Sequence, residues 1–156
     1  MIKILFICHG NICRSTMAES IMCWLVKKNH LQGAYCIASA ATSTEEIGNP
    51  IHHGTRRKLR EQNIPIVEHY ARQICLQDAE KYDYIIGMDD ANIRNLTRML
   101  PAQYHHKLSK LLDHTKRKGN IADPWYTGDF DETFVDVLEG CQGLLEETRP
   151  KSSRVK

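Results

Sequence analysis

The sequence has no long hydrophobic run and little net charge. Its apolar runs all fall well short of the roughly 20 residues that a membrane-spanning helix needs, and the first run is too short for a secretory signal. The net charge of +2 is too small to favour nucleic acid or a membrane surface as a main partner. We therefore expect a cytoplasmic protein that binds neither nucleic acid nor membrane.

The sequence also lacks the spacing of metal-binding residues. Its six cysteines stand at positions 8, 13, 23, 36, 75 and 141, and no two of them form a Cys-x-x-Cys pair. The histidine pairs 52–53 and 105–106 are adjacent rather than four residues apart, so we expect surface histidines instead of helical metal ligands. We predict neither a metal nor a cofactor, and without an export signal we expect reduced thiols.

No internal repeat or linker-like segment interrupts the chain. Its 156 residues, 42% of them hydrophobic, are enough for one domain with a substantial core. We expect a single domain over residues 1–148 and a basic, disordered tail over residues 149–156.

Short apolar segments, which predict strands, alternate with helical patterns. The predicted elements are strands near residues 4–7, 34–41 and 84–88, and helices near residues 15–29, 51–63, 76–80, 90–100 and 134–145. Residues 107–114 are ambiguous between helix and strand, and residues 123–129 are predicted to form a loop. This alternation predicts an α/β fold with a parallel sheet, whose ligands bind beyond the carboxyl ends of the strands.

The segment CHGNICRS, residues 8–15, carries the strongest chemical signal. It connects the first predicted strand to the first predicted helix, and five residues separate Cys8 from Arg14. If these residues curl, their backbone N–H groups form a nest for an oxyanion, and the guanidinium of Arg14 can hold two phosphoryl oxygens. A helix N-terminus and a nearby arginine both favour the thiolate of Cys8, which would be a nucleophile facing the bound phosphorus.

This segment resembles the active-site loop of the low-molecular-weight protein tyrosine phosphatases, and the resemblance extends over roughly residues 2–147. It implies a three-layer α/β/α fold with four parallel strands and the phosphatase loop after the first strand. It also implies hydrolysis of phosphotyrosine through a phosphocysteine intermediate, without a metal. The loop residues expected to contact the substrate are His9, Gly10, Asn11, Ile12, Cys13 and Arg14.

Asp123 is the candidate for the general acid that protonates the leaving oxygen. Asp-Pro is by itself a common way to open a turn, and Pro124 stiffens the segment. Trp125 and Tyr126 are candidates for a wall that excludes water and packs on an aromatic substrate. The resemblance strengthens this assignment, because the family carries an Asp-Pro followed by aromatics about 115 residues after its nucleophile. The same carboxylate would then act as base when water hydrolyses the intermediate.

Further positions carry family landmarks that bear on support and specificity. By resemblance, Asn11, Ser15, Ser39 and His69 form a hydrogen-bond network that holds the loop and tunes the thiolate. Ile12 stands where related arginine phosphatases usually have threonine, which argues against phosphoarginine as the substrate. Glu45 stands where mammalian relatives have an aromatic residue that lines the cleft, and Trp125 is a candidate to replace it.

Two other functions remain open from the residues alone. A thiol-dependent arsenate reductase shares this fold and loop, but Cys75 has no close second cysteine in the region that should hold the resolving pair. A phosphate-binding module without activity would need neither the nucleophile nor the acid. Expected partners are phosphotyrosine-containing proteins, with a tyrosine kinase as one candidate, and inorganic phosphate or another oxyanion in the site.

Cys13 raises a separate hypothesis because it lies in the same curled loop as Cys8. A disulfide between the two would block the nucleophile reversibly and protect it from over-oxidation. The alternative is that the Cys13 thiol only packs against the loop.

Overall fold

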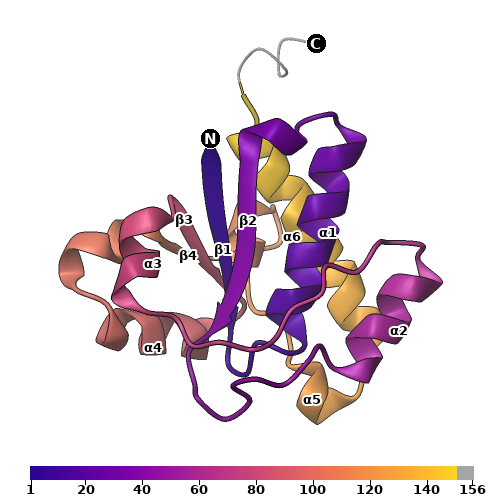
Figure 1. The fold of residues 1–156 in the computed structure, drawn as a ribbon, viewed down its shortest axis with the longest axis horizontal. Coiled ribbons are helices and arrows are strands. Elements are labelled where there is room, and N and C mark those ends of the chain that lie inside the picture. The colour runs from indigo at the N-terminus through magenta and orange to yellow at the C-terminus, as the bar shows by residue number, and fades with distance from the viewer. Residues whose placement is uncertain (151–156) are drawn as a thin grey trace.

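A computed structural model describes residues 1–150, in which a parallel sheet lies between two layers of helices (Figure 1). The strands are β1 (Ile2–Cys8), β2 (Tyr35–Ala41), β3 (Tyr84–Gly87) and β4 (Leu108–Lys110), arranged in the order β2-β1-β3-β4. Every neighbouring pair is parallel. This confirms the predicted α/β/α class and its four strands.

Alternate residues of β1 face the two helical layers. Ile4 and Phe6 pack against α1 (Arg14–Lys28) and α6 (Phe130–Thr148), whereas Leu5 and Ile7 face α3 (Leu76–Lys81) and α4 (Asp90–Met99). Because both faces of the sheet are covered, β1 is almost continuously apolar rather than alternating.

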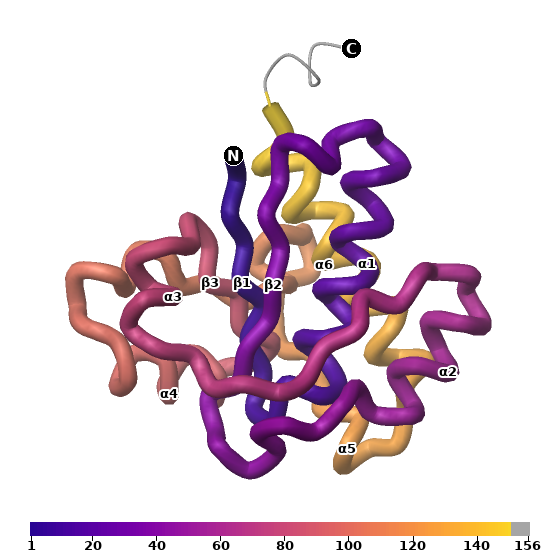
Figure 2. The backbone as a smooth tube through the Cα atoms, viewed as in Figure 1, coloured from indigo at the N-terminus to yellow at the C-terminus, as the bar shows by residue number. Residues whose placement is uncertain are grey.

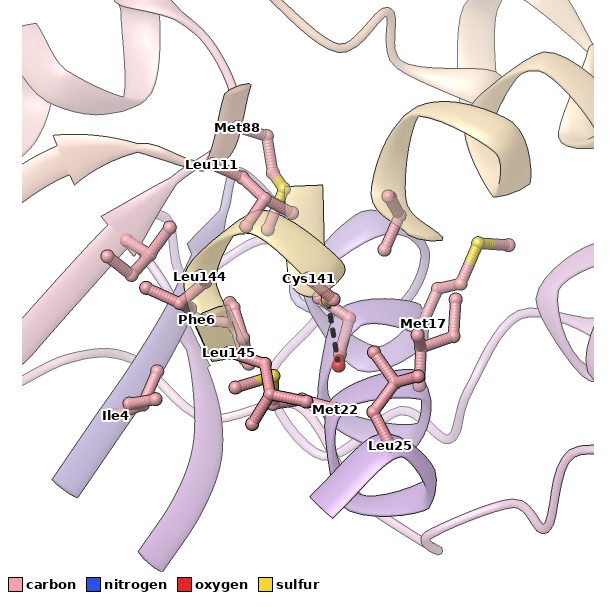
Figure 3. Packing of buried hydrophobic residues seen from close by; sticks show 14 of the residues in the cluster. Ile4, Phe6, Met17, Met22, Leu25, Met88, Leu111, Cys141, Leu144 and Leu145 are labelled. Atoms are coloured by element: carbon pink, nitrogen blue, oxygen red, sulfur yellow. Dashed lines mark hydrogen bonds between the residues drawn. The ribbon is translucent and has the colours of Figure 1, made fainter. Parts of the chain in front are cut away.

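The larger core lies between the sheet, α1 and α6 (Figure 3). There the Cys141 thiol points toward α1 and donates to the carbonyl oxygen of Ala18 at 3.7 Å. Its burial raises the pKa of Cys141 far above the ordinary value. This cysteine is therefore an inert part of the core rather than a reactive thiol.

The remaining elements are short. They are the helix α2 (His53–Glu61), the single turn α5 (Pro124–Thr127), and the 3₁₀ helices η1 (Gln32–Ala34), η2 (Ala102–Lys107) and η3 (Leu111–His114). Residues 107–114, ambiguous from sequence, divide into the last residue of η2, then β4 and η3. In the described part of the chain, no helix is both long and apolar enough to cross a membrane.

The prediction of a loop over residues 123–129 was wrong in part, because Pro124–Thr127 forms the helical turn α5. Pro124 occupies the first turn, where its missing N–H costs nothing, and the Asp123 side chain accepts from the Trp125 N–H at 3.0 Å. The last helix also starts earlier than expected, at Phe130, because Asp129 caps it through the Glu132 N–H.

The chain between α2 and α3 crosses beneath the carboxyl ends of β1 and β2 (Figure 2). The Ala41 N–H donates to the Arg72 carbonyl at 2.7 Å, and the Gly48 N–H donates to the Ala71 carbonyl at 2.8 Å. These bonds hold the segment against the end of β2 and the loop that follows it. Of the tail predicted at 149–156, residues 151–156 lie outside the described part of the chain.

Candidate active site

The Cys8 loop, residues 8–15, wraps around the sulfur of Cys8. The N–H groups of Asn11 and Ser15 donate to this atom at 3.3 and 3.4 Å, and the Ser15 hydroxyl forms a hydrogen bond with it at 3.1 Å. The sulfur lies at the carboxyl end of β1 and beside the first residues of α1, where the helix dipole also favours an anion. All of these interactions stabilise a thiolate more than a neutral thiol.

Asn11 holds the curl of this loop. It has a left-handed φ of 60°, which asparagine tolerates better than most residues, and its side chain is fully buried. Its amide nitrogen donates to the hydroxyls of Ser15 at 2.7 Å and Ser39 at 3.0 Å. Its amide oxygen accepts from His69 at 2.6 Å and from the Arg72 N–H at 3.3 Å. Every hydrogen-bonding position of this amide is therefore occupied.

Sequence reasoning missed Glu19, which lies behind the predicted network. Ser39 donates to its carboxylate at 2.5 Å, and burial raises the pKa of Glu19. His69 lies nearby, but its Nδ1 is 3.9 Å from Glu19, too far for a hydrogen bond. Burial and the charge of Arg72 lower the pKa of His69, so the ring is neutral and its Nε2–H donates to Asn11.

Arg14 is buried and fixed by acceptors that come from other parts of the chain. One terminal nitrogen donates to Asp89 at 2.6 Å and to the Ile121 carbonyl at 2.9 Å, and the other lies 3.4 Å from Asp123. Within the described residues its Nε has no hydrogen-bond partner, although it is buried. Burial disfavours the charged form of Arg14. The electrostatic interactions with Cys8, Asp89 and Asp123 outweigh this effect and raise the pKa of Arg14. The guanidinium is thus permanently charged, with a free donor.

Asp89, which stands directly before the helix predicted near residues 90–100, is a second residue of the site. Its Oδ1 accepts from the Asn92 N–H at 2.8 Å and caps α4, while its Oδ2 accepts from Arg14. One carboxylate therefore anchors the guanidinium to the helix that follows β3.

A cleft opens above Cys8. Its lining residues are Cys8, His9, Gly10, Ile12, Cys13, Glu45, Glu46, Asp123, Trp125 and Tyr126. The loop residues Cys8, Ile12 and Cys13 of this set are buried, whereas Trp125 and Tyr126 are 57% and 81% exposed. Of the residues predicted to contact substrate, Asn11 and Arg14 do not line the cleft; Asn11 faces the network instead.

Two glutamates, Glu45 and Glu46, also line the cleft. Glu45 is exposed and its carboxylate lies 2.5 Å from the Nε2 of His9, so these two predicted contact residues pair with each other. Glu46, which sequence reasoning missed, accepts from the Asn49 side chain at 3.1 Å.

All six cysteines are free thiols in the structure. Cys13 is buried, and this burial, together with the charge of Cys8, raises its pKa far above the ordinary value. Cys75 is exposed and its thiol donates to Asp78 at 3.4 Å.

Residues 3–154 match the protein family described as low molecular weight phosphotyrosine protein phosphatase. The chain is 41% identical over 147 residues to the low molecular weight protein-tyrosine-phosphatase YfkJ of Bacillus subtilis, which covers 93% of this chain and 94% of that protein. The crystal structure of YfkJ superimposes with a TM-score of 0.89, covering 96% of this chain and 98% of that one. The mouse low molecular weight phosphotyrosine protein phosphatase is 37% identical over 151 residues, which is 94% of this chain and 95% of that protein.

The structural likeness also extends to DARP, described as a Drosophila arginine phosphatase. Its crystal structure is 29% identical and has a TM-score of 0.87, covering 96% of this chain and 99% of that one. The fold alone therefore does not determine which phosphorylated side chain is cleaved.

Proposed function

The chain belongs to the low molecular weight phosphotyrosine protein phosphatase family, and from that premise we propose that it hydrolyses phosphotyrosine through a phosphocysteine on Cys8. The observation that carries this proposal is the setting of the Cys8 sulfur. Cys8 lines an open cleft together with Asp123, and its sulfur accepts from two backbone N–H groups and forms a hydrogen bond with the Ser15 hydroxyl.

In the first step the sulfur attacks phosphorus and the bond from phosphorus to the aryl oxygen breaks. Asp123, in its protonated form, gives its proton to the departing oxygen, so a neutral phenol leaves. In the second step Asp123 takes a proton from water as that water attacks phosphorus. The sulfur–phosphorus bond then breaks and inorganic phosphate leaves. Neither step calls for a metal, so we expect EDTA to leave the rate unchanged.

We assign Arg14 to the transferring phosphoryl group. Its Nε, which has no partner among the described residues, is the donor that we assign to an equatorial oxygen. The two terminal nitrogens are held by Asp89 and Asp123, so the guanidinium plane is set before substrate binds. Such preorganisation lowers the barrier because no donor has to reorient during the reaction.

Ile12 and Trp125 support an aryl substrate. Ile12 is a buried apolar residue in the lining, and Trp125 offers an exposed ring at the mouth. A phenyl ring gains from apolar contact with the buried Ile12, whereas a charged guanidinium would lose hydration there without a compensating hydrogen bond.

The expected partners are phosphotyrosine-containing proteins, a tyrosine kinase among them, and inorganic phosphate as product. A cytoplasmic location agrees with the six free thiols, because a thiolate nucleophile needs a reducing compartment.

One assay tests the proposal: hydrolysis of p-nitrophenyl phosphate and of a phosphotyrosine peptide, both with EDTA, by wild type, Cys8→Ser and Asp123→Ala. We expect Cys8→Ser to lose at least about 10⁴-fold in kcat and Asp123→Ala about 10²- to 10⁴-fold. His106→Asn, at an exposed position in η2, is the control and should match wild type.

Three outcomes would contradict the proposal. Preferential hydrolysis of phosphoarginine would make the chain an arginine phosphatase. Thioredoxin-dependent arsenate reduction without ester hydrolysis would support the alternative, a thiol-dependent arsenate reductase. None of the relatives reported above is described as such an enzyme. Phosphate binding with no turnover would indicate a binding module.

A further inference from the structure

His52 lies between the Cys8 loop, α2 and the turn that carries Asp123. Its backbone N–H donates to the Ile12 carbonyl at 2.9 Å, which ties it to the loop. Its Nδ1 accepts from the Gly54 N–H at 2.9 Å and caps α2. The same ring stacks on Phe130 with centroids 5.2 Å apart, and its edge meets Trp125 at 5.7 Å and 79°.

Histidine at this position was expected to be a surface residue, and that expectation was wrong for His52. The residue is half-buried, whereas its neighbour His53 is exposed. The close packing depends on Gly54, because a Cβ there would overlap the ring of Phe130. The start of α2 is therefore seated directly on the first residue of α6.

Through these contacts the His52 ring connects Trp125 to the start of α2 and to Phe130 of α6. Trp125 stands on a four-residue helix and is largely exposed, so its own turn gives it little support. Phe130 is fixed by α6 and by Gly54, and the His52 ring stacks on it. An edge-to-face pair of this kind stabilises one placement of the ring beyond what burial alone contributes.

We propose that His52 is a positioning residue that holds Trp125 over the cleft, so that the indole is in place to contact an aryl phosphate. This inference rests on the proposed role of Trp125 as the aromatic wall. His52 touches neither the Cys8 sulfur nor the phosphoryl site; it acts through Trp125.

The protonation state of the ring agrees with this role. Nδ1 can accept from Gly54 only when it carries no proton. Burial and the charges of His53 and Arg57 lower the pKa of His52, against the opposing effect of Asp123 and Glu46. The neutral ring, with its proton on Nε2, is thus the form that both caps α2 and packs on Trp125.

Two substitutions separate the cap from the ring. His52→Asn keeps a side-chain acceptor at a position where asparagine caps well, but it removes the ring. His52→Phe keeps a ring for stacking but removes the acceptor. Each is made in a Trp24→Phe background, which leaves Trp125 as the only tryptophan and lets its fluorescence anisotropy report its mobility.

We expect His52→Asn to lower the anisotropy of Trp125 and to raise KM for p-nitrophenyl phosphate about three- to tenfold, with kcat within about twofold. His52→Phe should keep KM near wild type while its unfolding midpoint falls, because the cap is lost. In a Trp125→Ala background His52→Asn should add nothing to KM, since its effect passes through the indole. His106→Asn is the matched control and should change none of these quantities.

Unchanged KM and anisotropy in His52→Asn would overturn the inference, as would an equal rise of KM in His52→Phe. If Trp125→Ala itself leaves KM unchanged while His52→Asn still frees the indole, the aromatic wall of the proposed function is wrong. The assignment of His52 to substrate binding then fails with it. The anisotropy tells this result apart from a failure of the His52 contact.

Discussion

The Cys8 loop and the turn Asp123–Tyr126 face each other across the cleft but stand in different surroundings. The sulfur of Cys8, the amide of Asn11 and the guanidinium of Arg14 are buried and bonded on several sides. Trp125 and Tyr126 are mostly exposed and stand on a single helical turn. Asp123 connects the two regions through its contact with Arg14, and His52 connects them through its bond to Ile12 and its ring contact with Trp125.

This difference matches the demands of the two tasks. Stabilising an anion requires donors that are aimed in advance, and burial keeps water from competing with them. Admitting a phosphorylated side chain of a protein requires an accessible rim. The proposed acid therefore lies where the rigid part meets the exposed part.

The substitution Asp123→Asn is the most direct test of this difference between the two regions. The amide oxygen can still accept from the Trp125 N–H and cap α5, but its NH2 group cannot accept from Arg14 and cannot deliver the proton that the leaving oxygen needs. We expect kcat to fall about 10²- to 10⁴-fold. The loss should be larger for phenyl phosphate than for p-nitrophenyl phosphate, because the poorer leaving group depends more on the acid. An equal loss for both substrates would mean that Asp123 has only a structural role.

Asn11→Gly tests the buried region by itself. Glycine accepts the left-handed φ of this position, so only the amide network is lost. Ser15, Ser39 and His69 would each lose one buried hydrogen bond, and we expect a loss of about 1–3 kcal/mol in stability. We also expect a clear fall in kcat, measured together with chemical denaturation.

Asn63→Gly is the matched control for this prediction. Asn63 also has a left-handed φ, of 57°, but it is exposed at the end of α2. The same substitution there should change stability and kcat little. If both variants behave alike, backbone conformation rather than the network determines the loop.

Trp125→Ala tests the exposed region. Because the indole is 57% exposed, its removal should barely change the unfolding midpoint. We expect KM for p-nitrophenyl phosphate to rise about three- to tenfold. The inhibition constant of inorganic phosphate should stay constant, since phosphate has no ring to contact the wall. A parallel change in both constants would place Trp125 at the phosphate site instead.

How much of this architecture was predictable differs between the two regions as well. β1, the Cys8 loop and the start of α1 are contiguous in sequence, so the apolar run and the motif together predict the strand, the turn and the helix. The role of Asp123 as the cap of α5 was missed, because an Asp-Pro pair fits a loop and a short helix equally well.

Contacts that join distant segments left no local signal. Glu19 stands on α1, which other segments of the chain cover on several sides. One of these contacts is the hydrogen bond from the Val67 N–H to Ser20, the next residue of the same helix. Asp89 meets Arg14 only because β3 lies beside β1 in the sheet. The distance between such residues depends on the order of the strands, which the sequence pattern does not specify.

The smallest expected effect concerns Asp78, which supports the buried region from α3. Its carboxylate accepts from the Arg72 guanidinium at 2.9 and 3.1 Å and from the Cys75 N–H at 2.9 Å. Burial opposes its charge, but these donors outweigh burial and lower the pKa of Asp78. Since the backbone of the same Arg72 donates to Asn11, the pair holds the segment that supports the network.

A pKa lower in the folded state than in the unfolded state means that ionised Asp78 stabilises the fold. This contribution is present above the unfolded pKa of about 4 and disappears as the pH falls through the folded pKa. Asp78→Asn should therefore destabilise the protein at pH 7 by about 1 kcal/mol, because Arg72 is partly exposed and solvent weakens the pair. Its unfolding free energy should converge with that of wild type as the pH falls through that range.

Asp131→Asn is the control. It removes the ion pair between the exposed Asp131 and Lys58 and should change the unfolding midpoint little at any pH, because solvent screens that pair. A constant difference between wild type and Asp78→Asn across the titration would show that packing, rather than charge, determines the contribution of Asp78.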